Sequence, residues 1–175
     1  MFSDPEKNIK QFDLREGQHV ADLGAGSGAC ALVAARAVGS QGKVYALEVQ
    51  RELLSGIKDE AARAKLFNVE VIWADIEKVN GTKLRNYAVD AVIVSNVLFQ
   101  IEDRGNFIKE IKRILKPGGR VLIVDWSDSF GGLGPQSSAV VPPEKARALF
   151  EGAGFKFEQV IDAGAHHYGI IMSKV

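Results

Sequence analysis

Gly24, Gly26 and Gly28 form a glycine-rich turn that could bring the backbone close to a ligand. The turn follows the apolar run Val20–Leu23 and leads directly into the helical pattern Ala29–Val38. Glycine removes the side chain where a chain must turn sharply and where a ligand must approach the main chain. The free N–H groups at the start of the following helix would face that ligand, and a carboxylate there gains a hydrogen bond of roughly 1.5 to 3 kcal/mol. The stretch therefore indicates a loop that binds a nucleotide-like ligand.

Two acidic residues accompany this turn. Asp22 stands just before it, and Glu48 ends the next apolar run, Lys43–Glu48. In a nucleotide-binding α/β unit, a carboxylate at that place accepts hydrogen bonds from a ribose. Other interpretations stay open, because the glycine spacing also fits a relaxed dinucleotide fingerprint, which favours a nicotinamide-dependent reductase. The turn can also serve tight packing alone, and Glu48 can be a solvated acid at the end of a strand.

Further polar residues follow the later apolar runs. Asp75 comes directly after Val69–Ala74, and Ser95 and Asn96 stand at the end of Ala88–Ser95. The carboxyl ends of parallel strands meet at one edge of a sheet, where ligands bind. Each position also has a structural interpretation, because Asp75 can cap the turn that follows it and Asn96 can cap a helix.

Several motifs together resemble one known family. They are Asp22-Leu-Gly-Ala-Gly-Ser-Gly28, the acids Glu48 and Asp75, Asp90-Ala-Val-Ile-Val-Ser-Asn96 and Lys116-Pro-Gly-Gly119. Their order and spacing resemble the class I S-adenosylmethionine-dependent methyltransferases, in the broad small-molecule subgroup that includes the type 11-like enzymes. The resemblance runs from about residue 4 to the C-terminus. It implies S-adenosyl-L-methionine as the cofactor, and transfer of its methyl group to an unidentified acceptor, for which it favours a small molecule.

The resemblance also implies roles for residues of the cofactor pocket. The glycines of the turn would pass under the methionine moiety, and Asp22 would order the turn or receive the ammonium group. Glu48 would accept both ribose hydroxyls. Asp75 would accept from the adenine amino group while the N–H of Ile76 faces the ring, and the end of the fourth strand would lie beside the donor methyl. The implied cofactor-binding residues are Asp22, Gly24, Gly26, Gly28, Glu48, Asp75, Ile76, Ser95 and Asn96.

The acceptor side carries fewer signals. Asn96, Asp125 and Asp128 are the candidate catalytic residues, and His166 or His167 is a further candidate base. These residues stand near the ends of the fourth and fifth strands or in the turn between the last two strands. No histidine or cysteine pair has the spacing of metal ligands, so we expect no metal.

The motif after the fourth strand limits the acceptor. Asn96 is followed by Val97-Leu98, so the Asn-Pro-Pro-aromatic signature of enzymes that methylate nucleic-acid amino groups is absent. Gln100 stands where the small-molecule subgroup often has a histidine, which is a departure from that pattern. The stretch Val38–Tyr45 has a weaker resemblance to fibrillarin-like RNA methyltransferases, although Asp125 stands where that family has a lysine. An RNA or protein acceptor is therefore one alternative, and a non-catalytic nucleotide-binding module is the other, because no base is compelling.

The stretch Trp126–Val141 breaks the alternation of strands and helices. It is rich in glycine, serine and proline, and it is long enough to suggest a function. Two hypotheses follow. Either this loop and the N-terminal helix form a minimal lid over a small acceptor, or a macromolecular acceptor docks on an open face.

Composition narrows the function classes further. The 175 residues fit a single domain, residues 1–175, which is large enough to bury most of its unfolded surface. Lys plus Arg and Asp plus Glu balance at 22 each, so net charge supports neither a nucleic acid nor a membrane as a partner. The chain begins without an apolar signal region and no apolar run reaches membrane-spanning length, so we expect a cytoplasmic protein. Cys30 is expected in the core.

The apolar pattern predicts alternating strands and helices. Strands are expected at His19–Leu23, Lys43–Glu48, Val69–Ala74, Ala88–Ser95, Arg120–Asp125, Phe155–Ile161 and Tyr168–Ser173. Helices are expected at residues 4–12, Ala29–Val38, Arg51–Lys65, Arg104–Leu115, and from Pro142 to Gly152 or Gly154. The last two strands are close enough in sequence to form a hairpin. The predicted fold is an α/β, Rossmann-like, doubly wound, seven-stranded sheet, mostly parallel with one antiparallel strand in a C-terminal hairpin, and with helices on both faces.

Overall fold

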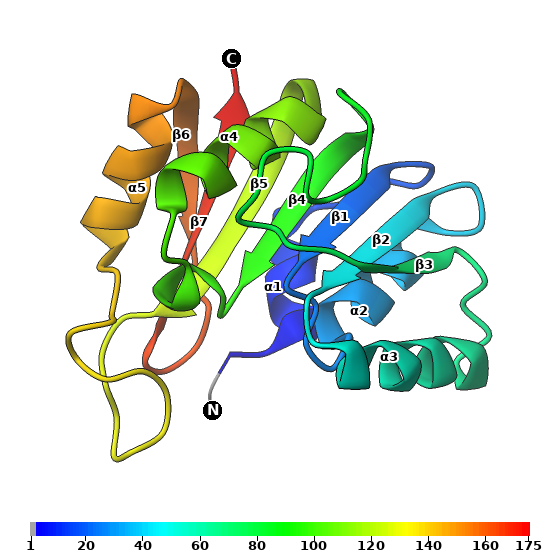
Figure 1. Ribbon diagram of the computed structural model, residues 1–175, viewed down its shortest axis with the longest axis horizontal. Coiled ribbons are helices and arrows are strands. Elements are labelled where there is room, and N and C mark those ends of the chain that lie inside the picture. The colour runs from blue at the N-terminus through cyan, green and yellow to red at the C-terminus, as the bar shows by residue number, and fades with distance from the viewer. Residues whose placement is uncertain (1–2) are drawn as a thin grey trace.

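The computed structural model describes residues 3–175; Met1 and Phe2, which belong to the expected single domain, lie outside the described residues. The strands are β1 His19–Leu23, β2 Lys43–Glu48, β3 Val69–Trp73, β4 Val89–Ser95, β5 Leu115–Trp126, β6 Phe155–Ile161 and β7 His167–Lys174. They form one seven-stranded sheet in the order β3-β2-β1-β4-β5-β7-β6 (Figure 1). Strand β7 runs antiparallel to both of its neighbours, and the pairs among β1 to β5 are parallel. The predicted Rossmann-like sheet with its C-terminal hairpin is confirmed.

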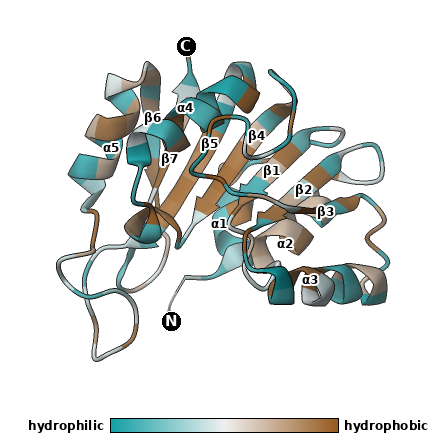
Figure 2. Ribbon diagram, viewed as in Figure 1, coloured by the Kyte–Doolittle hydropathy of each residue, from teal (hydrophilic) through white to brown (hydrophobic). Residues whose placement is uncertain are grey.

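Helices cover both faces of this sheet, as predicted. On one face lie α1 Pro5–Phe12, α2 Ala29–Val38 and α3 Arg51–Arg63, and on the other lie α4 Arg104–Ile114 and α5 Pro143–Gly152 (Figure 1). The central strands are therefore apolar along most of their length, as Figure 2 shows for β1, β4 and β5. A short 3-10 helix, η1 Leu98–Gln100, follows β4 and was not predicted from the sequence.

The largest difference from the predicted elements is at the start of β5. The helix before it ends at Ile114, and the strand begins at Leu115 instead of the expected Arg120. Leu115 pairs with Val89, and Arg120 pairs with Ala91, so the Lys116-Pro-Gly-Gly119 motif forms an irregularity inside the strand rather than a loop before it. Proline has no N–H to donate to a ladder, so it is tolerated at such an irregularity. The ends of the other elements differ from the expected ones by only one or two residues.

The connection between β3 and β4 is built of turns, and α4 anchors it. Glu110 of α4 is fully buried and accepts hydrogen bonds from the backbone N–H of Asn80, at 2.8 Å, and from the Thr82 hydroxyl. The Arg113 guanidinium lies 2.7 Å from the same carboxylate. Burial favours a higher pKa for Glu110, but the hydrogen bonds from Arg113 and Thr82 hold the pKa below its usual range. This network fixes the segment that continues from Asp75.

Helix α1 is tied to the turn between β6 and β7, far away in sequence. Asp4 caps the helix by accepting from the N–H of Glu6 at 3.0 Å. The Gln11 amide donates to the Asp162 carbonyl at 2.9 Å, and the Asp162 N–H donates back to the Gln11 side chain at 3.0 Å. Arg120 of β5 donates to the carbonyl of Phe12 at 2.7 Å. These contacts hold the last turn of α1 against β5 and the β6–β7 turn.

Candidate functional site

A cavity of about 600 Å³ opens at the carboxyl ends of the parallel strands. Its size lies within the range of small-molecule and cofactor pockets. The cavity is lined by the glycine turn, by the ends of β2 and β4, by the start of the β3–β4 connection and by residues 3 and 5 beside α1. Of the implied cofactor-binding residues, it brings together Asp22, Gly24, Gly26, Glu48, Asp75, Ile76, Ser95 and Asn96.

The three glycines of the turn are required for different structural reasons. Gly24 has a φ of +76°, and a Cβ there would lie 2.7 Å from a methyl group of Val97. Gly28 has a φ of +85°, and a Cβ there would lie 3.0 Å from a methyl group of Ile57. Gly28 does not line the cavity, so its role is to allow close packing against Ile57. Gly26 has a φ of +56° and no atom within 4 Å of the place a Cβ would take. A left-handed backbone with open space above it leaves room for a ligand.

Glu48 holds the glycine turn in place. Its side chain is 95% removed from solvent, with 5% relative exposure, and one oxygen accepts from the N–H of Gly26 at 2.8 Å. The other oxygen accepts from the N–H groups of Val49 and Gln50, both at 2.9 Å. A carboxylate has about four acceptor positions, so one remains on the oxygen that bonds to Gly26. The resemblance implied that Glu48 accepts both ribose hydroxyls, whereas the three backbone bonds leave room for one, and the sequence gave no signal for the bond to the turn.

Asp22 is a buried carboxylate with an unsatisfied oxygen. It is 1% exposed, and its Oδ2 has no hydrogen-bond partner among residues 3–175. Burial raises the pKa of Asp22 to about 7; the backbone N–H of Ala31 opposes the rise, and the nearby charge of Glu48 adds to it. An unpaired carboxylate oxygen in a buried position is costly, and a ligand that carries a cation would satisfy it.

Asp75 both lines the cavity and caps the turn that follows it. Its carboxylate accepts from the N–H of Glu77 at 3.1 Å and lies 2.9 Å from the ammonium group of Lys78. The hydrogen bond from Lys78 lowers the pKa of Asp75. The capping interpretation therefore describes the residue correctly, while its place in the cavity lining leaves the predicted contact with an adenine ring available.

The end of β4 presents strained backbone to the cavity. Asn96 has a φ of +56°, a region that asparagine enters more readily than most residues, and its Oδ1 is buried without a partner in the described chain. Its N–H donates to Val124 at 2.8 Å, and its carbonyl accepts from the Gln100 amide at 3.1 Å. Strained positions of this kind cluster at functional sites. Because η1 begins at Leu98 with Val97 as its cap residue, Asn96 is not a helix cap.

Among the lining residues that were not assigned to the cavity from the sequence are Cys30 and Gln100. Cys30 packs against the core, as expected, and also lines the cavity, where it makes a side-chain hydrogen bond with Ser95. Burial raises the pKa of its thiol to about 12, so it is not an activated nucleophile at neutral pH. Gln100 lines the cavity from η1. Two signals indicate this place: Gln100 follows a strand end, and it stands where the small-molecule subgroup often has a histidine.

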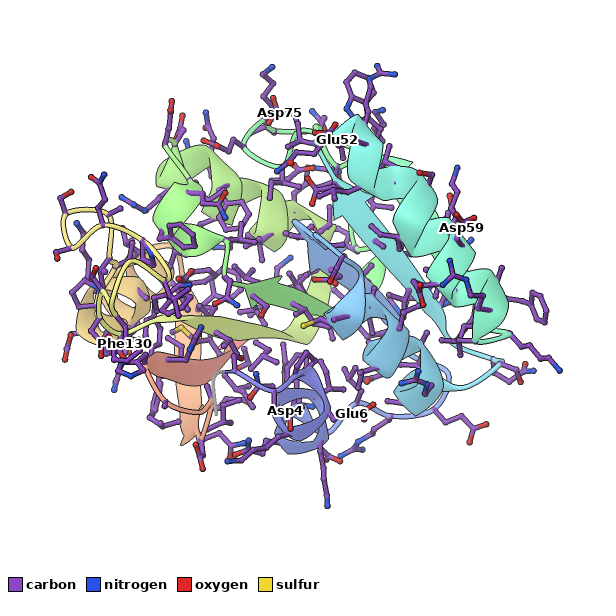
Figure 3. The ribbon with its side chains drawn as sticks, turned by 90° about the horizontal axis from the view of Figure 1, so that it is seen from below. Asp4, Glu6, Glu52, Asp59, Asp75 and Phe130 are labelled. Carbon is purple, nitrogen blue, oxygen red and sulfur yellow. The ribbon has the colours of Figure 1, made fainter. Side chains whose placement is uncertain are left out.

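The other candidate bases lie outside the cavity lining. Asp125 is buried at the end of β5, and Asp128 lies 2.8 Å from Nδ1 of His166. His167 bonds through Nδ1 to a backbone carbonyl at 3.0 Å. Phe130, labelled in Figure 3, stacks on His166 with 4.0 Å between the ring centroids. This contact joins the loop after β5 to the β6–β7 turn, and the lid hypothesis for that loop stays a prediction.

Tyr168 gives a first testable prediction, on stability. The residue is 8% exposed, and no hydrogen-bond partner of its hydroxyl lies within residues 3–175; burial raises its pKa. A buried hydroxyl without a partner is destabilising, so we expect Tyr168→Phe to raise the free energy of unfolding by about 1 kcal/mol. Urea unfolding of both proteins measures this difference in the free energy of unfolding. Tyr87→Phe, at a tyrosine with 56% exposure, is the matched control and should change nothing. A loss of stability in Tyr168→Phe would contradict the prediction.

No helix between residues 3 and 175 is both long and apolar enough to cross a membrane. Over the same residues, no group of three or more His, Cys, Asp or Glu side chains is arranged to hold a metal ion.

Known proteins resemble this chain over most of its length. A family model described as a methyltransferase domain matches residues 14–165. A ubiquinone/menaquinone biosynthesis C-methyltransferase of Serratia proteamaculans is 32% identical over 127 residues, which cover 72% of this chain and 49% of that protein. Its counterpart in Francisella philomiragia is 30% identical over 123 residues, covering 70% of this chain and 48% of that protein. The chain spans about half the length of these curated relatives.

Solved structures share the whole architecture. The crystal structure of a SAM-dependent methyltransferase from Aquifex aeolicus has a TM-score of 0.89 and 30% identity, and the match covers 99% of this chain and 91% of that one. A putative type 11 methyltransferase from Sulfolobus solfataricus has a TM-score of 0.80 and 23% identity, with 100% of this chain and 95% of that chain covered. The similarity to the Sulfolobus solfataricus structure concerns the fold alone.

Proposed function

Because the chain belongs to the methyltransferase domain family, in the class I S-adenosylmethionine-dependent, type 11-like group, we propose that it transfers a methyl group from S-adenosyl-L-methionine to a small-molecule acceptor. The observation that supports this most is the cavity at the strand ends, where an open glycine turn and the unsatisfied carboxylate of Asp22 face the same space. S-adenosylmethionine is the cofactor of this family.

The residues of the cavity fit this cofactor. The unpartnered oxygen of Asp22 matches the ammonium group, and the open space at Gly26 admits the methionine moiety. Glu48 keeps one acceptor position for a ribose hydroxyl, and Asp75, which lines the same cavity, is assigned to the adenine amino group. When bound, the cofactor supplies a methyl group activated by a sulfonium.

At the reaction centre, this chain's contribution is positioning. We assign Ser95 and Asn96 to the wall beside the reacting carbon, because both line the cavity at the end of β4. Holding donor and acceptor close and in line supplies several kcal/mol of the barrier to such a displacement. Asp125, Asp128, His166 and His167 lie outside the cavity lining, so we assign none of them as the base.

The acceptor is proposed to be a small molecule. Net charge is zero, so the chain has no overall attraction for nucleic acid. Ser3, Pro5 and Gln100 are among the residues that line the cavity, whose volume suits a small molecule. The relatives are named as C-methyltransferases of ubiquinone and menaquinone biosynthesis, so quinol-type aromatic rings are the first acceptors to test.

Calorimetric titration tests the proposal. We expect S-adenosylmethionine and S-adenosylhomocysteine to bind with one-to-one stoichiometry, because one cavity holds the fitting residues, and NADH not to bind. NADH serves as the control because the glycine spacing also fits dinucleotides. Binding of NADH in place of both methionine nucleosides, or no binding at all, would overturn the methyltransferase proposal.

A further inference from the structure

The surroundings of the buried Asp125 carboxylate argue against a role as a general base. Asp125 is 1% exposed, and each of its oxygens accepts from a backbone N–H. Oδ1 accepts from Trp126 at 2.7 Å, and Oδ2 accepts from Phe99 at 3.3 Å. Burial raises the pKa of Asp125, and the N–H groups of Trp126, Leu98 and Phe99 oppose this rise. Each oxygen thus accepts from the chain itself, and the carboxylate does not line the cavity.

Phe99 belongs to η1, and this helix lacks a cap of its own. Its cap residue is Val97, whose apolar side chain cannot accept a hydrogen bond. The first N–H groups of a helix have no partner inside the helix and need an acceptor from elsewhere. Strands β4 and β5 pair with Ser95 opposite Val124, which brings the next residue of β5 beside the start of η1. Asp125 supplies the acceptor from that neighbouring strand.

The segment that Asp125 holds is a wall of the cavity. Val97 lies against the glycine turn, since a Cβ on Gly24 would meet its methyl group at 2.7 Å. Gln100 donates to the Asn96 carbonyl at 3.1 Å, and both of these residues line the cavity together with Ile101. A shift of η1 would therefore move the cavity wall that these residues form.

We propose that Asp125 is a positioning residue of the cofactor cavity, which caps η1 across the sheet and so fixes the wall formed by residues 95–101. This inference rests on the proposed function, because the wall matters only if the cavity binds the methionine nucleoside. A base would act on the acceptor alone, whereas a cap of the wall acts on the affinity for the nucleoside even when no acceptor is present.

Binding of S-adenosylhomocysteine to variants separates the two roles. We expect Asp125→Ala to weaken binding at least tenfold in calorimetric titration. Asp125→Asn keeps one oxygen that can accept from the N–H groups of η1, but its NH2 group then faces the N–H of Trp126, so its affinity should fall between those of Asp125→Ala and the unchanged protein. Asp90→Asn is the matched control. Asp90 accepts from the His19 N–H at 2.9 Å at the opposite end of β4, so its replacement should lower stability and leave the affinity unchanged.

Amide hydrogen exchange provides a second readout that does not depend on the alanine variant folding. In the unchanged protein, the Leu98 and Phe99 amides should exchange slowly, and those of Asp125→Asn should remain protected. Unchanged affinity in Asp125→Ala, or fast exchange of both amides in the unchanged protein, would overturn the positioning role. Equal weakening in Asp125→Asn and Asp125→Ala would overturn it too, because an oxygen left facing the N–H groups of η1 would then make no difference to binding. If the unchanged protein does not bind S-adenosylhomocysteine, the proposed function fails, while slow exchange would still report the cap.

Discussion

Replacing Glu48 with alanine is expected to weaken binding of S-adenosylhomocysteine at least 100-fold. The variant loses the acceptor for the ribose hydroxyl and also the bonds that hold Gly26, Val49 and Gln50. Hydrogen bonds to a charged group contribute roughly 1.5 to 3 kcal/mol each, and a 100-fold change in affinity corresponds to about 2.7 kcal/mol. The loss of one ligand bond together with a loosened glycine turn reaches that value. Calorimetric titration gives the dissociation constant directly.

Two further variants make this measurement specific to Glu48. Glu48→Gln keeps the shape and one carbonyl oxygen, so its affinity should fall between those of the unchanged protein and Glu48→Ala. Glu52 is an exposed acid in the first turn of α3 and is labelled in Figure 3; Glu52→Ala should leave affinity unchanged. If Glu48→Ala binds as tightly as Glu52→Ala, the assignment of Glu48 to the cofactor is wrong.

Asp22→Asn is expected to stabilise the free protein at pH 8 while weakening its binding of the cofactor. Burial raises the pKa of Asp22 from its ordinary 3.8 to about 7, so the folded state holds a proton that the unfolded state releases. The contribution of Asp22 to the free energy of unfolding is fully present below about pH 3.8 and is lost as pH rises through about 7. Between pH 5.5 and pH 8 the loss is about 2 kcal/mol, at about 1.36 kcal/mol for each pKa unit. Asparagine does not titrate, so the free energy of unfolding of the variant does not fall in this way as the pH rises.

Urea unfolding of both proteins at pH 5.5 and pH 8 checks the effect. The stability of Asp22→Asn relative to the unchanged protein should rise by about 2 kcal/mol between the two pH values. Asp75 and Asp90 have lowered pKa values, so they titrate below pH 5.5 in both proteins and do not disturb the comparison. A relative stability that does not depend on pH would mean that Asp22 is already ionised at pH 5.5. The variant should also bind S-adenosylmethionine less tightly, because the partner of the ammonium group is gone.

Most of the fold could be predicted from the sequence because its signals are local. Apolar runs that end in acids or glycines mark parallel strands covered on both faces, and the structure has the strands in those places. The start of β5 was missed because Pro117 and the glycines after it are typical of a helix end, while the pairing of Leu115 with Val89 depends on the neighbouring strand. Helix η1 was missed for a related reason, because its cap comes from Asp125 and not from the residue before it.

The candidate site could be predicted as a set of positions but not as a set of bonds. A glycine turn and strand-end acids are recognisable in sequence, and the structure places them around one cavity. The sequence gives no sign that Glu48 bonds to Gly26, because that contact depends on how β1 and β2 lie beside each other. It also could not separate Asn96, which lines the cavity, from Asp125, which stands at a comparable strand end but turns toward the backbone of η1.

The bonds between α1 and the β6–β7 turn link the two ends of the described chain. Gln11 and Asp162 are separated by most of the sequence, and Ser3 and Pro5 at the start of α1 line the cavity. Helix α1 also packs on α2, which follows the glycine turn. One wall of the cavity therefore belongs to a helix that is held both by its near neighbour in sequence and by the last hairpin. A substitution in the β6–β7 turn can thus act on the cavity from a distance, through α1.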